Sequence, residues 1–301
     1  MVSRQDSGTG AGPAGGRSPS GALAAGLYFV ATPIGTARDI TLRALDILRD
    51  ADVIAAEDTR TLRHLLDIHG VPLGHRPLVA YHDHNGAAQR PRLLHWLAEG
   101  FSVAYASEAG TPLVADPGYR LGEAAIAAGH PVTAAPGPSA VLAALTVSGL
   151  PSDRFMFAGF APTGGPARRN WLAELKAVPS TMIFFESPRR VAEMLADLRD
   201  VFGEGRNAAV CRELTKRFEE VTRGTLQDLA ARFAGDAPRG EVVIVVGRPL
   251  PAVFDEAAIT AALRARLPHM SRKDAAAEVA QALNRPRREI YQIALGIDSD
   301  G

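Results

Sequence analysis

SEAGTP at residues 107–112 and PGPSA at residues 136–140 are the two stretches that decide the fold of this chain. Each follows a short β-rich run, at residues 101–106 and 131–135, and precedes an apolar helical pattern. Both are therefore expected at the carboxyl ends of neighbouring strands, where open α/β sheets bind ligands. Loops this rich in Gly, Pro, Ser and Thr present backbone N–H groups, hydroxyls and carbonyls to a small polar ligand. Tight turns without a ligand are the alternative, but two such loops in register favour ligand binding.

A third loop follows the first β-rich run. It reads TPIG at residues 32–35, and a helix is expected to begin after a cap at Asp39 or Thr41. The loop occupies the place of a dinucleotide fingerprint but holds a single glycine, so the G-x-G-x-x-G pattern that binds pyrophosphate is absent. A nucleoside ligand without phosphates remains compatible with this loop.

Strand and helix patterns alternate through most of the chain, which predicts an α/β fold. The first half has expected strands at 27–32, 53–56, 78–80, 102–106 and 131–135, and expected helices at 39–50, 59–69, 87–98 and 119–128. The second half has expected helices at 139–148, 168–177, 188–202 and 225–234, and expected strands at 154–160, 180–186, 207–213, 218–223 and 241–247. The run VVIVV at 242–246 lacks polar alternation and is expected to be a central strand buried on both faces. We predict a parallel-sheet domain at 27–136 and a second α/β domain with a mixed sheet at 137–250.

A helical extension is expected at residues 252–301, after a proline-flanked linker. Amphipathic patterns at 257–267, 274–283 and 288–295 predict three short helices that resemble a helix-turn-helix bundle, with Ser271 capping the second. Between residues 264 and 288 the extension has seven Lys or Arg and two acids, a local charge of +5. An ordinary solvated face and an RNA contact both account for this charge.

Composition limits the remaining possibilities. The 301 residues include 33 basic and 33 acidic side chains, so nucleic-acid binding has to come from a local patch. A single cysteine, Cys211, excludes an internal disulfide and fits a reducing cytoplasm. Residues 1–26 are rich in Gly, Ser, Ala and Pro and are expected to be a disordered leader. Glycines and prolines interrupt the most apolar stretch, residues 124–150, so we expect no membrane span and a cytoplasmic protein.

Nine short stretches carry a family resemblance. They are YFVATPIG at 28–35, EDTR at 57–60, YHDHN at 81–85, SEAGTPLVADPG at 107–118, PGPSA at 136–140, GLPSDRF at 149–155, FESPRR at 185–190, RELTK at 212–216 and RGE at 239–241. In this order they resemble the ribosomal small-subunit methyltransferase I family, over nearly all of residues 27–295. The resemblance implies a tetrapyrrole-methylase-like fold. It also implies an enzyme that uses S-adenosylmethionine to methylate the ribose 2′-hydroxyl of a cytidine in the decoding region of 16S rRNA. This chain departs from the family at Glu108, where Asp or Asn is common, and in its long leader.

The resemblance also implies where the methyl donor binds. It would lie bent in the cleft between the two α/β domains, against the three loops. The loop residues expected to contact it are Pro33, Ile34, Gly35, Ser107, Gly110, Thr111, Val114, Pro138, Ser139 and Ala140. Phe185 and Glu241 are expected to contact it from the second domain.

A ribose hydroxyl is a weak acid, so the reaction needs a general base or cations that stabilise the developing alkoxide. Polar clusters follow three expected strands, at 57–60, 81–85 and 186–190. We expect Glu57 or Asp83 to accept the proton. Arg60, Arg189 and Arg190 would then contact phosphates and transition-state charge. Helix-capping carboxylates with a salt-bridged arginine are the alternative reading of each cluster.

A metal site is a weaker alternative at the second of these clusters. In an extended run His82 and His84 would lie on one face, which is compatible with a metal ion that Asp83 also binds. No recognisable motif supplies a third strong ligand, and transfer from a sulfonium requires no cation. We therefore expect no metal.

RNA contacts are expected in both the second domain and the extension. The residues concerned are Arg190, Lys216, Arg272, Lys273, Arg285, Arg287 and Arg288. The expected partner is 16S rRNA within the small ribosomal subunit, and the expected assembly is a homodimer. Two alternatives remain: a small-molecule methyltransferase with a hydrophobic, arginine-lined trough, and a non-enzymatic RNA-binding assembly factor with a vestigial donor pocket.

Overall fold

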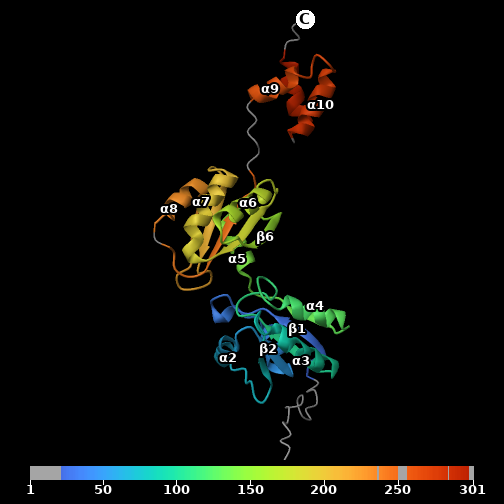
Figure 1. Ribbon diagram of the computed structural model, residues 1–301, viewed down its shortest axis with the longest axis vertical. Coiled ribbons are helices and arrows are strands. Elements are labelled where there is room, and N and C mark those ends of the chain that lie inside the picture. The colour runs from blue at the N-terminus through green and yellow to red at the C-terminus, as the bar shows by residue number, and fades with distance from the viewer. Residues whose placement is uncertain (1–21, 236, 250–255, 284, 298–301) are drawn as a thin grey trace, which may run out of the picture. The chain divides into compact units, whose positions relative to one another are not determined.

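The computed structural model describes residues 22–235, 237–249, 256–283 and 285–297. These residues form two compact units, one ending at Arg248 and the other beginning at Pro249. The first unit contains two five-stranded sheets, and the second contains helices (Figure 1). Residues 1–21 of the expected leader lie outside the described residues, whereas Gly26 is the first residue of a strand.

The first sheet is parallel, as predicted. Its strands are β1 (Gly26–Val30), β2 (Val53–Ala56), β3 (Leu78–Ala80), β4 (Ser102–Ala106) and β5 (Val132–Ala135). They lie in the order β3-β2-β4-β1-β5, with every neighbouring pair parallel. Val30 at the end of β1 pairs with Ala106 on β4 and with Ala135 on β5. The loops that follow these three strands therefore leave one edge of the sheet side by side.

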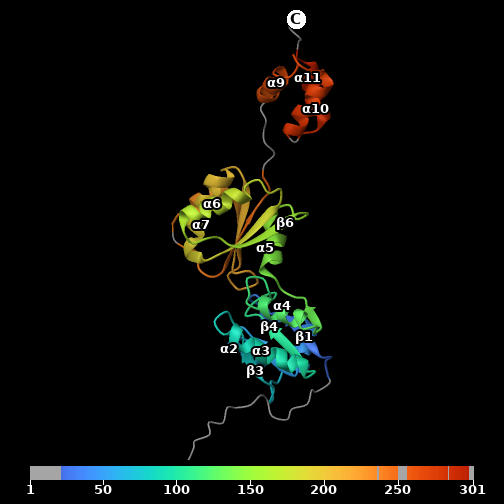
Figure 2. The same ribbon diagram turned by 45° about the vertical axis from the view of Figure 1, so that its right-hand side comes forward.

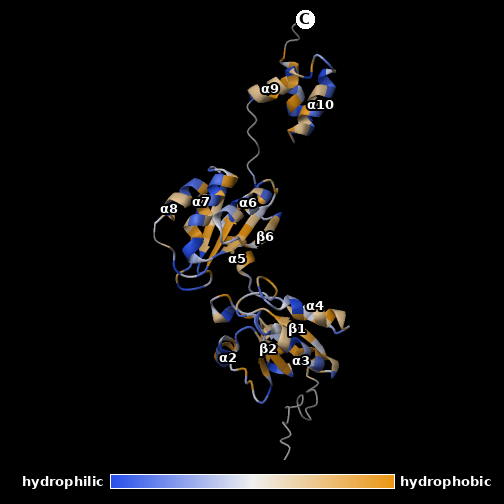
Figure 3. Cartoon of the chain, viewed as in Figure 1, coloured by the Kyte–Doolittle hydropathy of each residue, from blue (hydrophilic) through white to orange (hydrophobic). Residues whose placement is uncertain are grey.

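Helices cover both faces of this sheet, because successive strand residues point to opposite faces. They are η1 (Ala37–Asp39), α1 (Leu42–Asp50), α2 (Thr59–Ile68), α3 (Gly86–Ala98) and α4 (Tyr119–Ala127). On β2, Val53 packs in the core beneath α3 and α4, and Ile54 packs in the core beneath α1 and α2. Most strand residues are accordingly hydrophobic, and the helices alternate hydrophobic and hydrophilic residues (Figure 3). Of the two predicted caps, Thr41 is the one that precedes α1, and its side chain accepts a hydrogen bond from Ala44 N.

The second sheet is mixed, also as predicted. Its strands are β6 (Phe155–Phe160), β7 (Thr181–Glu186), β8 (Asn207–Arg212), β9 (Glu220–Thr225) and β10 (Val242–Val246), in the order β6-β7-β10-β8-β9. Only β6 and β7 pair in parallel. The VVIVV run forms β10, the central strand, and all five of its residues are buried. The prediction of a central strand covered on both faces is confirmed.

Different helices cover the two faces of the second sheet (Figure 2). The helices are α5 (Ala140–Ser148), α6 (Gly165–Leu175), η2 (Pro188–Arg190), α7 (Val191–Phe202) and α8 (Leu226–Arg232). Phe184 packs beneath α6, α7 and α8, whereas Ile183 packs beneath α5. Ile34 and Val114, from loops of the first sheet, join the core on the α5 side. The α5 face is therefore the one that meets the ligand-binding loops.

The second unit consists of α9 (Glu256–Arg264), α10 (Arg272–Ala282) and α11 (Arg287–Leu295) in its described part. It has its own core, to which Leu263, Val279 and Ile290 contribute from the three helices. The Ser271 side chain caps α10 by accepting a hydrogen bond of 3.2 Å from Asp274 N, as predicted. Within the described ranges, no helix combines the length and the apolar character needed to span a membrane.

Candidate active site

The three predicted loops are joined to one another at the carboxyl edge of the first sheet. Thr32 and Gly110 exchange two backbone hydrogen bonds, each 3.0 Å long. The Thr111 hydroxyl donates to the carbonyl of Pro138 at 2.9 Å. Loops after β1, β4 and β5 therefore form a single surface, as expected from their positions after neighbouring strands.

The loop after β4 is held in an unusual conformation. Gly110 has a φ of +80°, and the non-glycine residues Leu113 and Ala115 also have positive φ, of 72° and 56°. Such backbone conformations are costly for residues with a side chain and cluster at ligand sites. Asp116 stabilises the loop by accepting hydrogen bonds from the hydroxyl of Tyr105 at 2.9 Å and from Gly118 N at 2.7 Å. Hydrogen bonds within the protein thus support this loop conformation.

A cavity of about 480 Å³ lies between these loops and the second sheet, in the size range of small-molecule sites. Eight of the twelve residues expected to contact the donor line it, together with the proposed base Glu57. They are Ile34, Glu57, Gly110, Thr111, Val114, Ser139, Ala140, Phe185 and Glu241. The two α/β halves therefore both contribute walls to the cavity, which is the arrangement that the family resemblance implies.

Four residues of the predicted donor set do not line the cavity, and three of them make contacts around it instead. The buried Ser107 hydroxyl donates to the carbonyl of Gly110 at 2.6 Å. Gly35 approaches a turn of the second half so closely that an added Cβ would lie 2.6 Å from Thr215 Oγ1. Pro138 contributes its carbonyl to Thr111, and Pro33 lies in the same loop as Gly35 without reaching the cavity.

Glu57 is the proposed base that the structure places at the cavity. Its Oε2 atom accepts a hydrogen bond of 3.2 Å from Glu108 N. Burial is the main cause that raises the pKa of Glu57, and the nearby carboxylates of Asp116 and Glu108 raise it further. Glu57 therefore holds a proton more readily than an exposed glutamate does.

The other proposed catalytic residues lie outside the cavity lining. Asp83 is exposed in a turn after β3, the edge strand of the first sheet. Arg60 is 90% exposed and pairs with Asp58 at 3.0 Å, and its hydrogen bonds help to lower the pKa of Asp58 to about 2. Asp58 caps α2, so the helix-capping alternative describes this pair. Arg189 is exposed and directly follows Pro188, which lines the cavity.

The histidine cluster forms a turn rather than the extended run that a metal site would use. Asn85 Oδ1 accepts a hydrogen bond from His82 N at 2.9 Å, and its Nδ2 donates to the carbonyl of Ala80 at 3.0 Å. The rings of His82 and His84 lie 6.0 Å apart. Across the described ranges of the chain, no three His, Cys, Asp or Glu side chains are grouped to hold a metal ion.

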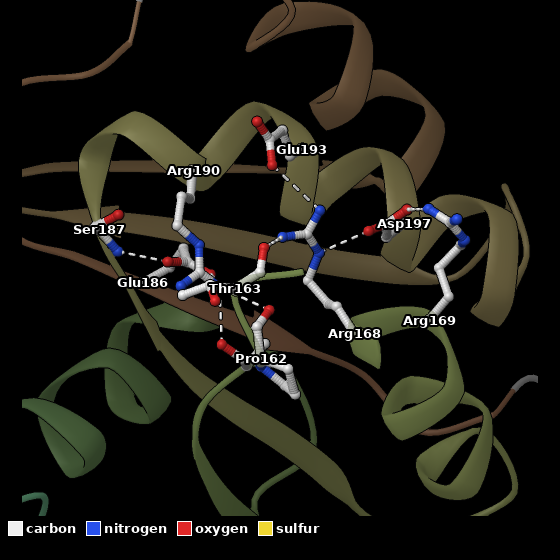
Figure 4. Close-up of polar contacts among 10 residues, drawn as sticks. Pro162, Thr163, Arg168, Arg169, Glu186, Ser187, Arg190, Glu193 and Asp197 are labelled. Atoms are coloured by element: carbon white, nitrogen blue, oxygen red, sulfur yellow. Dashed lines mark hydrogen bonds and ion pairs between the residues drawn. The ribbon is translucent and has the colours of Figure 1, made fainter. Parts of the chain in front are cut away.

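Glu186 lines the cavity and pairs with the half-buried Arg190 (Figure 4). The Glu186 side chain is 0% exposed and accepts hydrogen bonds from Ser187 N at 2.7 Å and from Arg190 at 3.1 Å. Arg190 also donates to the carbonyls of Ala161 at 2.8 Å and Pro162 at 3.2 Å. All three of these Arg190 bonds are made by Nη2, and a contact between Arg190 and a phosphate stays a prediction. Burial raises the pKa of Glu186.

Lys216 is engaged in a similar way. Its Nζ atom lies 2.9 Å from Glu213 Oε1 and 2.9 Å from Glu241 Oε2. Among the predicted RNA-contacting residues of the second unit, Arg285 pairs with Glu289 and Arg272 donates to the carbonyl of Ile297. The remaining three, which have exposed side chains, are Lys273, Arg287 and Arg288.

Sequence reasoning missed several residues of the cavity. Those from the first-sheet loops are Glu108, Ala109, Ala115 and Asp116. Those from the second half are Phe160, Glu186, Ser187, Pro188, Gly240, Val242 and Val243. The polar cluster at residues 186–190, called the ESPRR cluster below, did point to Glu186, Ser187 and Pro188, although only its arginines were assigned a role. The apolar residues carry no such signal, because a strand residue at a cavity wall looks like a core residue in the sequence.

Known proteins are similar to this chain in both fold and sequence. The family Tetrapyrrole (Corrin/Porphyrin) Methylases matches residues 26–230, and the RsmI C-terminal HTH domain matches residues 254–298. The cobalt precorrin-4 methyltransferase CbiF is 18% identical, with a TM-score of 0.56 over 73% of this chain and 94% of that one. Uroporphyrin-III C-methyltransferase of Thermus thermophilus, complexed with S-adenyl homocysteine, is 20% identical, with a TM-score of 0.52 over 73% of this chain and 96% of that one. These two structures establish the fold.

Sequence relatives establish the family. The protein named ribosomal RNA small subunit methyltransferase I in Mesorhizobium japonicum is 50% identical, over 94% of this chain and 96% of its own length. The proteins of the same name in Xylella fastidiosa and Mycobacterium tuberculosis are 46% and 44% identical, over 88% and 89% of this chain and 97% and 94% of their own lengths. The resemblance of the nine motifs is thereby confirmed: the chain belongs to the ribosomal RNA small subunit methyltransferase I family, within the tetrapyrrole methylases.

Proposed function

We propose that this chain is an S-adenosylmethionine-dependent methyltransferase that acts on the ribose 2′-hydroxyl of a cytidine in the decoding region of 16S rRNA. The cavity at the joined loops carries the proposal, in a chain 50% identical to a relative named ribosomal RNA small subunit methyltransferase I. The substrate particle that we propose is the small ribosomal subunit, and the enzyme would act as a cytoplasmic homodimer.

The residues at the cavity fit the donor. Because Gly110 has no side chain, it leaves a space in the cavity wall, which we call the Gly110 cradle. An added Cβ would lie 3.2 Å from Ile34 Cγ2 and would partly fill this space. Ile34 and Val243 provide an apolar surface suited to an adenine ring. The carboxylates of Glu108 and Asp116 also line the cavity, where they would attract the ammonium and sulfonium charges of the donor.

S-adenosylmethionine supplies, when bound, an electrophilic methyl group whose transfer needs no covalent enzyme intermediate. The protein has to hold the ribose hydroxyl in line with that methyl group and accept the hydroxyl proton. We assign the proton to Glu57 rather than to Asp83, because Glu57 lines the cavity and Asp83 does not. The hydrogen bond from Glu108 N holds the carboxylate of Glu57 at the cavity wall.

Charge argues against the small-molecule alternative. The cavity lining has five acidic residues and no Lys or Arg, as far as the described residues extend. An arginine-lined trough was expected for that class of enzyme. The well-formed cavity likewise argues against a binding factor that has lost its donor site.

Methylation of small-subunit particles that lack the modification tests the proposal. The purified chain would be incubated with isotopically labelled S-adenosylmethionine and either these particles or free 16S rRNA. Mass spectrometry of nuclease fragments should find the label on one ribose of the decoding region, mainly with the particles. A label on a base, a label elsewhere in the rRNA, or no label would contradict the proposal. Sedimentation velocity of the same preparation tests the homodimer.

A further inference from the structure

Strand β6 contains a bulge close to the cavity. Phe157 pairs with Ile183 on β7, but the next pair joins Gly159 to Phe184, so Ala158 is an extra residue. Gly159 has a φ of +74°, a left-handed conformation that glycine adopts without strain. Bulges of this kind turn the following side chains to the other face of the strand and are frequent beside active sites.

The bulge turns Phe160 toward the cavity. Met156 packs beneath α6 to α8, and regular alternation would place residue 160 on the same face. The Phe160 ring instead lies 5.7 Å from the ring of Phe185, on the face where Phe157 also contacts Phe185 at 4.7 Å. Phe160 thereby becomes part of the cavity wall, which it could not be in a regular strand.

Phe160 is also unusually exposed for an apolar cavity residue. It is 57% exposed, whereas Ile34, Val242 and Val243 in the same wall are all buried. The buried apolar residues therefore form the floor of the cavity, and the exposed Phe160 ring forms an aromatic rim. An exposed aromatic ring at a rim provides a flat face for a planar group that arrives from solvent.

The segment that carries Phe160 is fixed to the ESPRR cluster. Arg190 donates to the carbonyls of Ala161 and Pro162, and the buried Glu186 carboxylate pairs with Arg190 at 3.1 Å (Figure 4). In the same cluster Arg189 is exposed, and it has no hydrogen-bond or ion-pair partner among the described residues. The rim therefore presents an aromatic face and an unpaired cation on two segments tied to each other.

We propose that Phe160 stacks on the base of the target nucleotide and that Arg189 contacts a neighbouring phosphate. This inference rests on the function proposed above and adds the subsite that receives the nucleotide. Proteins that read RNA in single-stranded regions stack unpaired bases on aromatic side chains. An enzyme that takes a base out of its stack loses stacking energy, and an aromatic side chain on which the base stacks offsets that loss. Stacking would place the ribose over the cavity that holds Glu57.

Three variants of the full chain test the assignment. Phe160→Ala removes the ring, Phe160→Trp keeps an aromatic face, and Phe155→Ala removes a phenylalanine that is 43% exposed on the same strand but lies outside the cavity lining. Loss of one stacked base should raise the KM for small-subunit particles about tenfold or more in Phe160→Ala. Its donor affinity, measured by calorimetry, should stay unchanged. Phe160→Trp and Phe155→Ala should keep a KM close to that of the wild type.

Each other result would decide against the inference. An unchanged KM in Phe160→Ala, with an active wild type, would remove the stacking role and leave the proposed function standing. A loss of donor affinity in that variant would assign the ring to the donor instead of the nucleotide. A failure of Phe160→Trp to restore the KM would show that stacking is not what the ring provides. Wild-type enzyme that methylates no rRNA would refute the proposed function itself.

Discussion

Glu57 Oε2 accepts a 3.2 Å hydrogen bond from Glu108 N, although the two residues are 51 positions apart in the sequence. Glu57 directly follows β2 and Glu108 lies just after β4, and these strands are neighbours in the sheet. The contact holds a carboxylate at the cavity wall, where burial and two nearby acids raise its pKa. A base whose pKa is raised toward the working pH removes a proton more effectively.

Glu57→Gln should greatly slow methyl transfer without preventing donor binding. Glutamine can still accept the hydrogen bond from Glu108 N, so the loop should keep its conformation. Loss of a general base typically lowers a rate by about 10²- to 10⁴-fold. Single-turnover methylation of small-subunit particles and calorimetry with S-adenosylmethionine measure the two effects. Asp83→Asn is the matched control, and equal loss in both variants would contradict the assignment.

The same substitution should change how stability depends on pH. A carboxyl whose pKa is raised by folding contributes stability below its unfolded pKa, and this contribution is lost as the pH rises through the folded pKa. Glu57→Gln should therefore have a higher Tm than the wild type near pH 7. This Tm difference should vanish as the pH falls below about 4. Differential scanning calorimetry across this range measures it. A Tm difference independent of pH would show that ionisation of Glu57 is not its cause.

Gly110→Ala should weaken donor binding more than a Gly→Ala substitution at a position of similar φ outside the cavity. The added Cβ would lie 3.2 Å from Ile34 Cγ2 inside the cradle, and Gly110→Leu should block the cavity altogether. Gly100→Ala is the control, because Gly100 has a similar φ of +84° and an added Cβ there would meet nothing within 4 Å. Both alanine variants should lose about 1 kcal/mol of stability from backbone strain. Equal donor affinities in the two variants would remove this loop from the donor site.

The elements of the fold could be predicted from the sequence, but the order of the strands could not. Runs such as VVIVV at 242–246 and the helical periodicity between runs identified strands and helices to within a few residues. Nothing in these local patterns says that β3 lies at the edge of its sheet. Asp83 follows β3 and Glu57 follows β2, so the sheet order separates two candidates that the sequence treated alike.

Prediction of the site failed where function depends on backbone geometry or on apolar side chains. The polar loops were found because strand ends meet at one edge of a parallel sheet. Phe160 was missed because regular alternation gives no reason to turn it toward a cavity, and the bulge at Gly159 became visible only in the pairing with β7. The sequence also gives no sign that Arg190, which was assigned to phosphate, donates through Nη2 to two carbonyls and to Glu186.

Asp197→Ala should destabilise the first unit strongly. Asp197 Oδ2 accepts a 2.6 Å hydrogen bond from Arg168 Nε, and both residues are buried (Figure 4). Removing one partner of a buried ion pair leaves an uncompensated charge, at a cost of about 3–5 kcal/mol. Glu193 also contacts Arg168, so the lower end of this range is expected. Urea denaturation measures the loss, and Glu123→Ala, which breaks an exposed pair with Arg120, should cost less than about 1 kcal/mol.

Charge removal from the second unit should weaken RNA binding and leave donor binding unchanged. The unit has its own core, so exposed side chains such as Lys273 and Arg288 can be replaced without disturbing the cavity. Each cation that neutralises a phosphate adds about 0.7 to 0.9 to the slope of log K against log salt concentration. Lys273→Gln combined with Arg288→Gln should therefore lower that slope by up to about 1.4 to 1.8.

A charge-matched variant separates this effect from a general change in net charge. Lys176→Gln combined with Arg199→Gln removes the same charge from the first unit, at the residue that follows α6 and within α7, and should leave the slope close to that of the wild type. Binding to small-subunit particles would be measured at several salt concentrations for all three proteins, and for a chain ending at Arg248. If the truncated chain and both double variants kept the wild-type slope, the second unit would not contact RNA through its cations, and its basic residues would be an ordinary solvated face.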